Sequence, residues 1–114
     1  MKGIVNILGT PYTYDTACED IGIMSGHDGV CRVFDKQLYI RTKELMCAES
    51  PEGFEYRFDH VLRHELIHAI AEESGVSYGD NEDIVDWIAH IIPIVNKAFD
   101  EVKYGNNEGS QSQI

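Results

Sequence analysis

Long apolar stretches are missing from this sequence of 114 residues. No run approaches the roughly 20 apolar residues that a membrane-spanning helix needs. The N-terminal segment MKGIVNILGTPYTYD also lacks the apolar core and the small-residue cleavage site of a signal peptide. We therefore expect a cytoplasmic protein that does not act at a membrane.

Basic residues are also scarce. The chain has 9 Lys and Arg against 20 Asp and Glu, which gives a formal net charge of −11 at pH 7. Phosphate backbones and anionic membranes repel such a chain, so we expect no nucleic-acid partner. The charge favours a cation as ligand, or a basic partner.

Cysteine is too sparse for a disulfide framework. The three cysteines, Cys18, Cys31 and Cys47, are odd in number, widely spaced and never in a CxxC pair. This usage is typical of free thiols in a reducing compartment, which agrees with a cytoplasmic location.

The length predicts one domain, which we place at residues 1–104. Residues 105–114 are rich in Gly, Asn, Ser and Gln, and we expect a flexible tail there. Nothing in the sequence bears on the oligomeric state.

The N-terminal half reads mainly as strands. Residues 2–9 are β-branched and apolar and predict a first strand, which Gly9 and Pro11 would end. Residues 12–29 are mixed, with a possible short helix in their middle. Residues 29–35 and 36–45 alternate in polarity and predict a hairpin, so we expect a three-stranded sheet.

Two helices should follow. Ser50, Pro51 and Glu52 form a helix-start signal, and the first helix is expected to run to Ser74, with Gly75 as its C-cap. The second should open at Asp80 or Asn81, and Pro93 should kink or restart it. The order predicts an α+β fold, with the sheet packed on both helices.

The first helix carries the segment DHVLRHELIHAIAEE. Its residues His64-Glu65-Leu66-Ile67-His68 form an HExxH motif. A four-residue step turns a helix by about 400°, so His64 and His68 lie one turn apart on one face and can converge on one Zn²⁺. Glu65 lies beside them, where its carboxylate can act as general base on a water molecule.

The alternative interpretation of this motif is a solvated polar face. The opposite arc of the helix carries the apolar residues Phe58, Leu62, Leu66 and Ile70. A helix that is buried on one side and keeps His, Glu and His together on the other favours a metal site.

A catalytic zinc needs a third protein ligand. In the second helix Glu82, Asp86 and His90 recur every four residues. Glu82, which follows His68 by 14 residues, would complete a His₂Glu site. Asp86, one turn further on, could accept the other N–H of His64 and fix its tautomer.

HELIHA followed by NEDIVD resembles the gluzincin metallopeptidases, the thermolysin-like enzymes with HExxH on one helix and N-E-x-x-x-D on the next. The resemblance implies a small zincin-like domain with His64, His68 and Glu82 as zinc ligands, Glu65 as general base and Asp86 as their outer partner. The whole chain is also similar to small phage and prophage proteins.

The sequence departs from that family in two respects. The spacing from His68 to Glu82 is short, and we expect no counterpart of the C-terminal subdomain that supplies the oxyanion-stabilising histidine. Tyr78, in the loop between the motifs, is our candidate for that role, the alternative being an ordinary loop tyrosine. The strand at residues 37–42 is expected to be the sheet edge that pairs with a peptide.

Two further histidines lie one step outside the metal cluster. His60 precedes His64 by one turn, and a third histidine from the same helix would crowd the metal, so we expect a supporting residue. If the two helices face each other, His60 should lie near His90, with no more than one residue between their side chains.

These patterns predict a zinc-dependent metallopeptidase that acts on a peptide or protein substrate. The alternative is a non-catalytic zinc-binding phage-type module that binds a protein partner, or a latent enzyme whose tail, residues 104–114, fills its own cleft. Glu65 favours the enzyme, because a structural zinc site needs no base. The absence of a recognisable specificity pocket favours the module.

Overall fold

The computed structural model describes residues 1–49 and 51–105 of the chain. Its elements in chain order are β1 (Lys2–Ile7), β2 (Thr10–Cys18), α1 (Ile21–Met24), β3 (Gly29–Arg32), β4 (Gln37–Arg41), α2 (Lys43–Glu49), α3 (Phe54–Ser74), the 3₁₀ helix η1 (Ser77–Asp80) and α4 (Glu82–Tyr104). The expected α+β class is confirmed. The predicted tail falls almost wholly on residues 106–114, which lie outside the described residues.

The sheet in the described part of the chain has four strands rather than the expected three, in the order β1-β2-β4-β3. The strand that the sequence analysis missed is β2. Leu8 and Gly9, both with positive φ, make a two-residue turn that brings Thr10 opposite Ile7. Two successive positive φ values suit the right-handed twist of a hairpin, so Gly9 turns the chain into a second strand and does not end the sheet.

The pairing of β2 with β4 is parallel, whereas the other two pairs are antiparallel. β4 is an inner strand, because it is hydrogen-bonded to β2 on one side and to β3 on the other. The expectation that residues 37–42 form the sheet edge is therefore wrong. The free edge on that side is β3, which is hydrogen-bonded to β4 alone.

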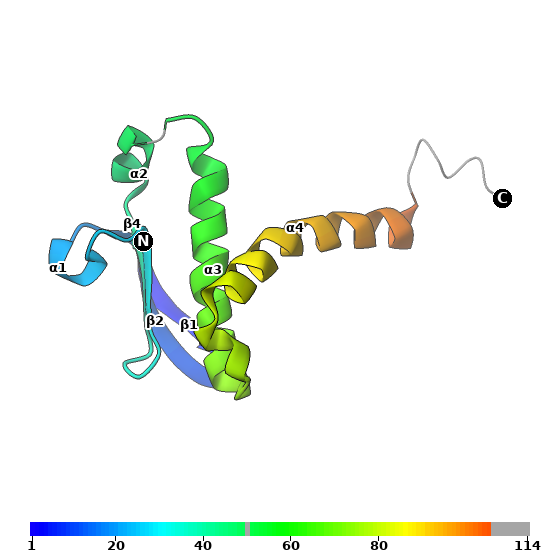
Figure 1. The fold of residues 1–114 in the computed structure, drawn as a ribbon, viewed down its shortest axis with the longest axis horizontal. Helices are drawn as coiled ribbons and strands as arrows, with labels where there is room; N and C mark the ends of the chain where they lie inside the picture. The colour runs from blue at the N-terminus through cyan, green and yellow to red at the C-terminus, as the bar shows by residue number, and fades with distance from the viewer. Residues whose placement is uncertain (50, 106–114) are drawn as a thin grey trace.

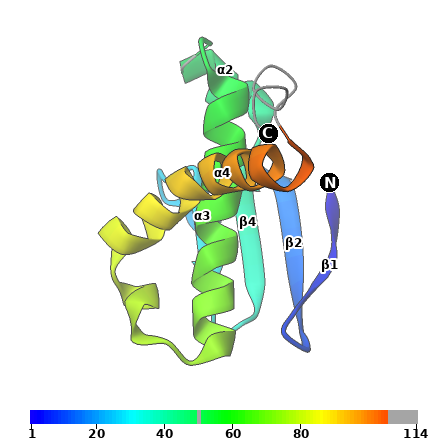
Figure 2. The ribbon, with the colours of Figure 1, turned by 90° about the vertical axis from the view of Figure 1, so that its right-hand side faces the viewer.

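The chain forms three layers, with α3 in the middle (Figures 1 and 2). On one side α3 packs against the sheet through Ala69, which joins a core cluster with Tyr12 and Leu38. On its other side Ile67 packs against Val85 and Ala89 of α4. Both faces of α3 are therefore fixed, which gives its remaining arc a defined orientation.

The helix boundaries differ from expectation at several points. Residues 43–49 form the short helix α2, although they were partly assigned to a strand. α3 begins at Phe54 with Gly53 as its N-cap, so Pro51 and Glu52 precede the helix, and Ser50 lies outside the described residues. α3 ends at Ser74 with Gly75 as its C-cap, as expected.

α4 runs through Pro93 without restarting and projects away from the other layers (Figure 1). Its distal part leaves Ile94, Val95, Phe99 and Val102 exposed. Among the described residues, none of the helices combines the length and the apolar character required to cross a bilayer.

Candidate metal centre and active site

Two helices and the short turn between them position the candidate site. α3 contributes His64, Glu65 and His68, which lie between the start of α4 and the edge strand β3. After Gly75, η1 turns the chain back, and the Asn81 side chain caps α4 by accepting a hydrogen bond from the Ile84 N–H at 3.1 Å. This cap fixes Glu82 at the first position of α4, over the histidines of α3.

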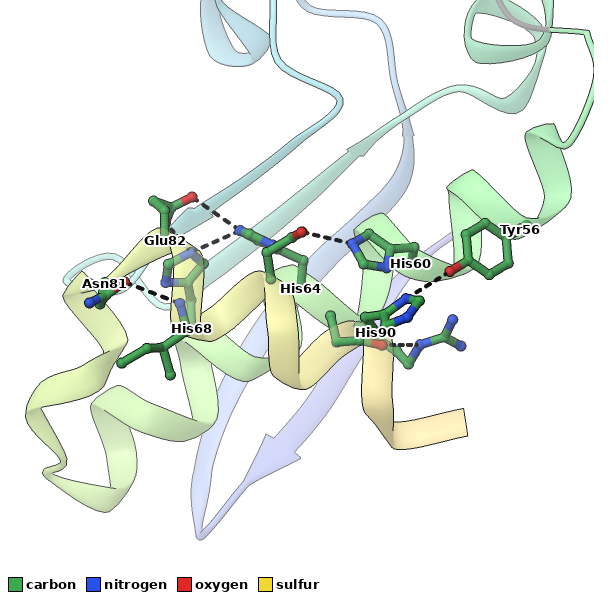
Figure 3. Close-up of polar contacts among 11 residues, drawn as sticks. Tyr56, His60, His64, His68, Asn81, Glu82 and His90 are labelled. Carbon is green, nitrogen blue, oxygen red and sulfur yellow. Dashed lines mark hydrogen bonds and ion pairs between the residues drawn. The ribbon is translucent and has the colours of Figure 1, made fainter. Parts of the chain in front are cut away.

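The three predicted metal ligands converge (Figure 3). The Nε2 atoms of His64 and His68 lie 3.2 Å apart. The Glu82 carboxylate spans the two rings, with Oε1 2.6 Å from Nε2 of His68 and Oε2 3.2 Å from Nε2 of His64. Bonds of about 2.0–2.1 Å to a tetrahedral zinc would separate its ligand atoms by about 3.3 Å, close to two of these three distances.

The outer nitrogens of both rings are held by protein acceptors. Nδ1 of His68 lies 2.9 Å from the Gly79 carbonyl, and Nδ1 of His64 lies 3.2 Å from Oδ1 of Asp86. A carbonyl or a carboxylate can only accept, so each Nδ1 carries a proton, and a neutral ring held in this way has its lone pair on Nε2.

Two lone pairs and a carboxylate therefore face one point. Such an arrangement is repulsive unless a proton or a cation lies between the groups. The donor set fits a divalent metal, and two imidazoles with one carboxylate suit zinc by ligand type.

Asp86 has a second partner. Its Oδ1 lies 2.7 Å from Nε2 of His60, closer than its contact with His64. The hydrogen bond from His60 is the main reason why the pKa of the Asp86 carboxyl lies below its ordinary value. Asp86 therefore supports both rings, and His60, His64 and Asp86 form a second group with metal-ligand spacing.

His60 and His90 lie near each other as predicted, and one residue, Tyr56, contacts both of their side chains. The Tyr56 ring stacks on His60 with centroids 6.1 Å apart, and its hydroxyl lies 3.2 Å from Nδ1 of His90 (Figure 3). Nδ1 of His60 is buried and has no hydrogen-bond partner among the described residues. His90 is one step further from the metal cluster than Asp86.

The Glu65 side chain points towards β3. Its side chain is only 8% exposed and forms no hydrogen bond with a described residue. A Cβ atom placed on Gly29 of β3 would lie 2.7 Å from Glu65 Oε2, so the strand passes directly over the carboxylate. Burial, with a smaller contribution from Glu82 and an opposing one from His64, raises the pKa of Glu65 to about 7.

Two cavities, of about 490 and 210 Å³, meet at Glu65. They share the lining residues His27, Gly29, Glu65 and Glu82, and we treat them as the two halves of one cleft. The larger half extends towards the C-terminal end of α3, and the smaller half extends towards His60 and Asp86. A third cavity, of about 580 Å³, lies between the sheet and α3, but its lining is mostly apolar and holds none of the metal-binding groups.

The structure does not bring Tyr78 into the cleft. Its side chain packs against the core cluster of Ile67, Val85 and Ala89, and it is absent from the lining of either half. The loop position is as predicted, but the apolar contact with α4 turns the ring inwards.

His27, a loop histidine that the sequence places at the surface, is exposed and lines both halves of the cleft. The adjacent Asp28 is paired with Arg57 of α3, which fixes the loop beside the helix. In the sequence, a histidine between two glycine-containing turns gives no sign of this placement.

Comparison of the chain with protein-family models, with curated proteins and with solved structures finds no match.

Proposed function

We propose that the chain is a zinc-dependent metallopeptidase of a minimal gluzincin type. One observation carries the proposal. Nε2 of His64, Nε2 of His68 and the Glu82 carboxylate face one point, and a buried carboxylate without a partner, Glu65, lies beside them. A structural site needs the ligands but has no need for that fourth group.

His64, His68 and Glu82 would hold the metal, and Asp86 and the Gly79 carbonyl keep the two rings in the ligating tautomer. When bound, zinc supplies a Lewis acid for the activation of water and of the peptide carbonyl. Glu65 takes a proton from the attacking water and delivers it to the amide nitrogen as the C–N bond breaks.

Two further parts of the cleft would act on the substrate. The free edge of β3 offers backbone N–H and C=O groups to an extended peptide, which would then lie beside Glu65. His27 replaces Tyr78 as the candidate donor to the oxyanion, because its imidazole lines both halves of the cleft.

A non-catalytic or latent zinc-binding module of phage type, which binds a protein partner, is the second candidate function. The exposed apolar residues on the projecting part of α4 favour it, since a protein partner could bury them. This reading gives Glu65 no role.

Metal content and peptide hydrolysis, measured on four proteins, separate the two. Wild type and Glu65→Gln should each hold one zinc, whereas Glu82→Ala should lose most of it; His90→Ala, a histidine outside the ligand set, is the matched control and should keep it. Hydrolysis of a peptide library should be present in wild type and lost in Glu65→Gln. Full zinc with no hydrolysis by wild type would favour the module, and undiminished zinc in Glu82→Ala would refute the ligand assignment.

A further inference from the structure

The two halves of the cleft differ in how their acidic groups are paired. In the smaller half, Asp28 is bound by Arg41 and Arg57, and Asp86 is bound by His60 and His64. Every aspartate there already has a cationic or N–H partner. Apart from Glu65 and Glu82, which line both halves, the smaller half therefore offers little uncompensated negative charge.

The larger half contains two carboxylates without such partners. Glu72 of α3 and Asp80 of η1 line it, and neither side chain forms a hydrogen bond or an ion pair with a described residue. Among the residues that the structure describes, no lysine or arginine lines this half of the cleft. Zinc would offset Glu65 and Glu82 near the metal centre, but not these two groups further along the cleft.

The walls of the larger half are suited to an aliphatic stem. Its lining includes three valines, Val30, Val33 and Val76. Lysine and arginine side chains bury their methylene groups against apolar surface and keep the charged end near polar groups. Valine walls that lead to two unpaired carboxylates match both parts of such a side chain.

The buried, unpartnered carboxylate of Glu65 is a separate observation that points to a ligand in this cleft. It is 8% exposed, it lines both halves and no described residue satisfies it. Glu72 follows Glu65 by seven residues, about 10 Å along α3. An extended peptide advances about 3.3 Å per residue, so one to three residues cover that distance, with a long side chain making up any difference.

We propose that the larger half of the cleft is a subsite for a lysine or arginine side chain, bound by Glu72 and Asp80, on one side of the peptide bond that is cleaved. The inference rests on the proposed function, because it names the substrate class of the same site. The charge asymmetry between the halves predicts that the preference occurs on one side of the scissile bond only.

Binding tests this without requiring turnover. The zinc-loaded Glu65→Gln protein lacks the base, so it should bind peptides without cleaving them. The probes are fluorescent peptides with a fixed central residue, and they carry either Lys or Gln at one of the three positions on either side of it. Lys peptides should bind about tenfold more tightly at one or more positions on one side, and the ratio should fall as salt is raised.

Adding Glu72→Gln and Asp80→Asn should bring the ratio close to one, and Glu72→Lys should favour peptides with Glu in place of Lys. Asp59→Asn, an exposed acid on the same helix outside the cleft, is the control and should leave the ratio unchanged. Equal binding of Lys and Gln peptides, or a preference that survives the double substitution, would overturn the proposal.

These outcomes are independent of the proposed function. If wild type hydrolyses neutral and basic peptides equally well, the subsite is refuted while the peptidase stands. If wild type hydrolyses nothing, the peptidase fails, and the binding ratio still decides whether the acidic subsite exists.

Discussion

Replacing Gly29 with alanine tests the placement of the base against the edge strand. The added Cβ would lie 2.7 Å from both Val61 Cγ1 and Glu65 Oε2, and 2.8 Å from Glu65 Cγ. Carbon atoms pack at about 3.5–4.0 Å, so the overlap with the Val61 methyl is about 0.8–1.3 Å. Valine in a helix has one strongly preferred rotamer, so Val61 cannot turn away without cost.

Overpacking of this kind costs about 1–3 kcal/mol. Alanine also lowers the conformational entropy of the unfolded chain, which stabilises the folded state by about 0.4–1 kcal/mol. The net loss should lie between about 0 and 2.6 kcal/mol, and a domain of this size should lose up to about 10 °C in Tm. Glu65 must also shift, and displacement of a catalytic group by about 1 Å can lower kcat by roughly a hundredfold.

Thermal unfolding followed by circular dichroism measures the first effect. Zinc-free protein should be used, because bound metal adds its own stabilisation. Val61→Ala removes the clashing methyl, so Gly29→Ala combined with Val61→Ala should be more stable than the sum of the single changes predicts, by at least about 0.5 kcal/mol. Additive effects of the two changes would show that β3 does not lie against α3 at Glu65.

Four other predictions concern single side chains. Asp86→Asn should weaken zinc binding by about 10–100-fold in a competition titration with a chelator, because it loosens the ligand rings; an unchanged affinity would remove its supporting role. His27→Ala should lower kcat and change KM less, whereas Tyr78→Phe should leave kcat unchanged. The reverse pattern would make Tyr78 the donor to the oxyanion. Lys36, Tyr12 and Thr10 donate hydrogen bonds to Glu73 and lower its pKa from 4.5 to about 2, so its stabilisation is full above about pH 4.5 and is lost as the pH falls towards 2. The Tm difference between wild type and Glu73→Gln should therefore be larger at pH 6 than at pH 2, and a constant difference would contradict the assignment. Partial burial, with smaller contributions from Glu65 and Glu72, raises the pKa of Cys31 to about 12, so its alkylation by iodoacetamide at pH 8 should be much slower than that of an unfolded control, and equal rates would contradict the raised pKa.

The local patterns predicted the two long helices and the meeting of three side chains between them. Helical spacing alone puts His64 and His68 on one face, and a short helix-turn-helix return leaves few positions from which Glu82 could approach. The cap at Asn81 and the stop at Gly75 are also local signals. Local periodicity therefore accounts for the core of the candidate site.

The parts that failed depend on contacts distant in sequence. β2 contains Thr and Tyr, which favour strands, but Gly9 and Pro11 were taken as the end of the sheet rather than as a hairpin. Its parallel pairing with β4 makes β3 the edge, and no local pattern encodes that order.

Side-chain orientation was the other weak point. Tyr78 turns into the α3–α4 contact, and His27 reaches the cleft. Each of these outcomes is decided by which neighbouring element packs against the residue. Composition and spacing carry no information about that choice.

The most direct test of the central claim is a crystal structure of the zinc-loaded protein with anomalous diffraction recorded on both sides of the zinc absorption edge. The account predicts one anomalous peak, bonded to Nε2 of His64, Nε2 of His68 and the Glu82 carboxylate, with Asp86 held against Nδ1 of His64. A peak at the His60–Asp86 group alone, or no peak between the three predicted ligands at saturating zinc, would contradict it.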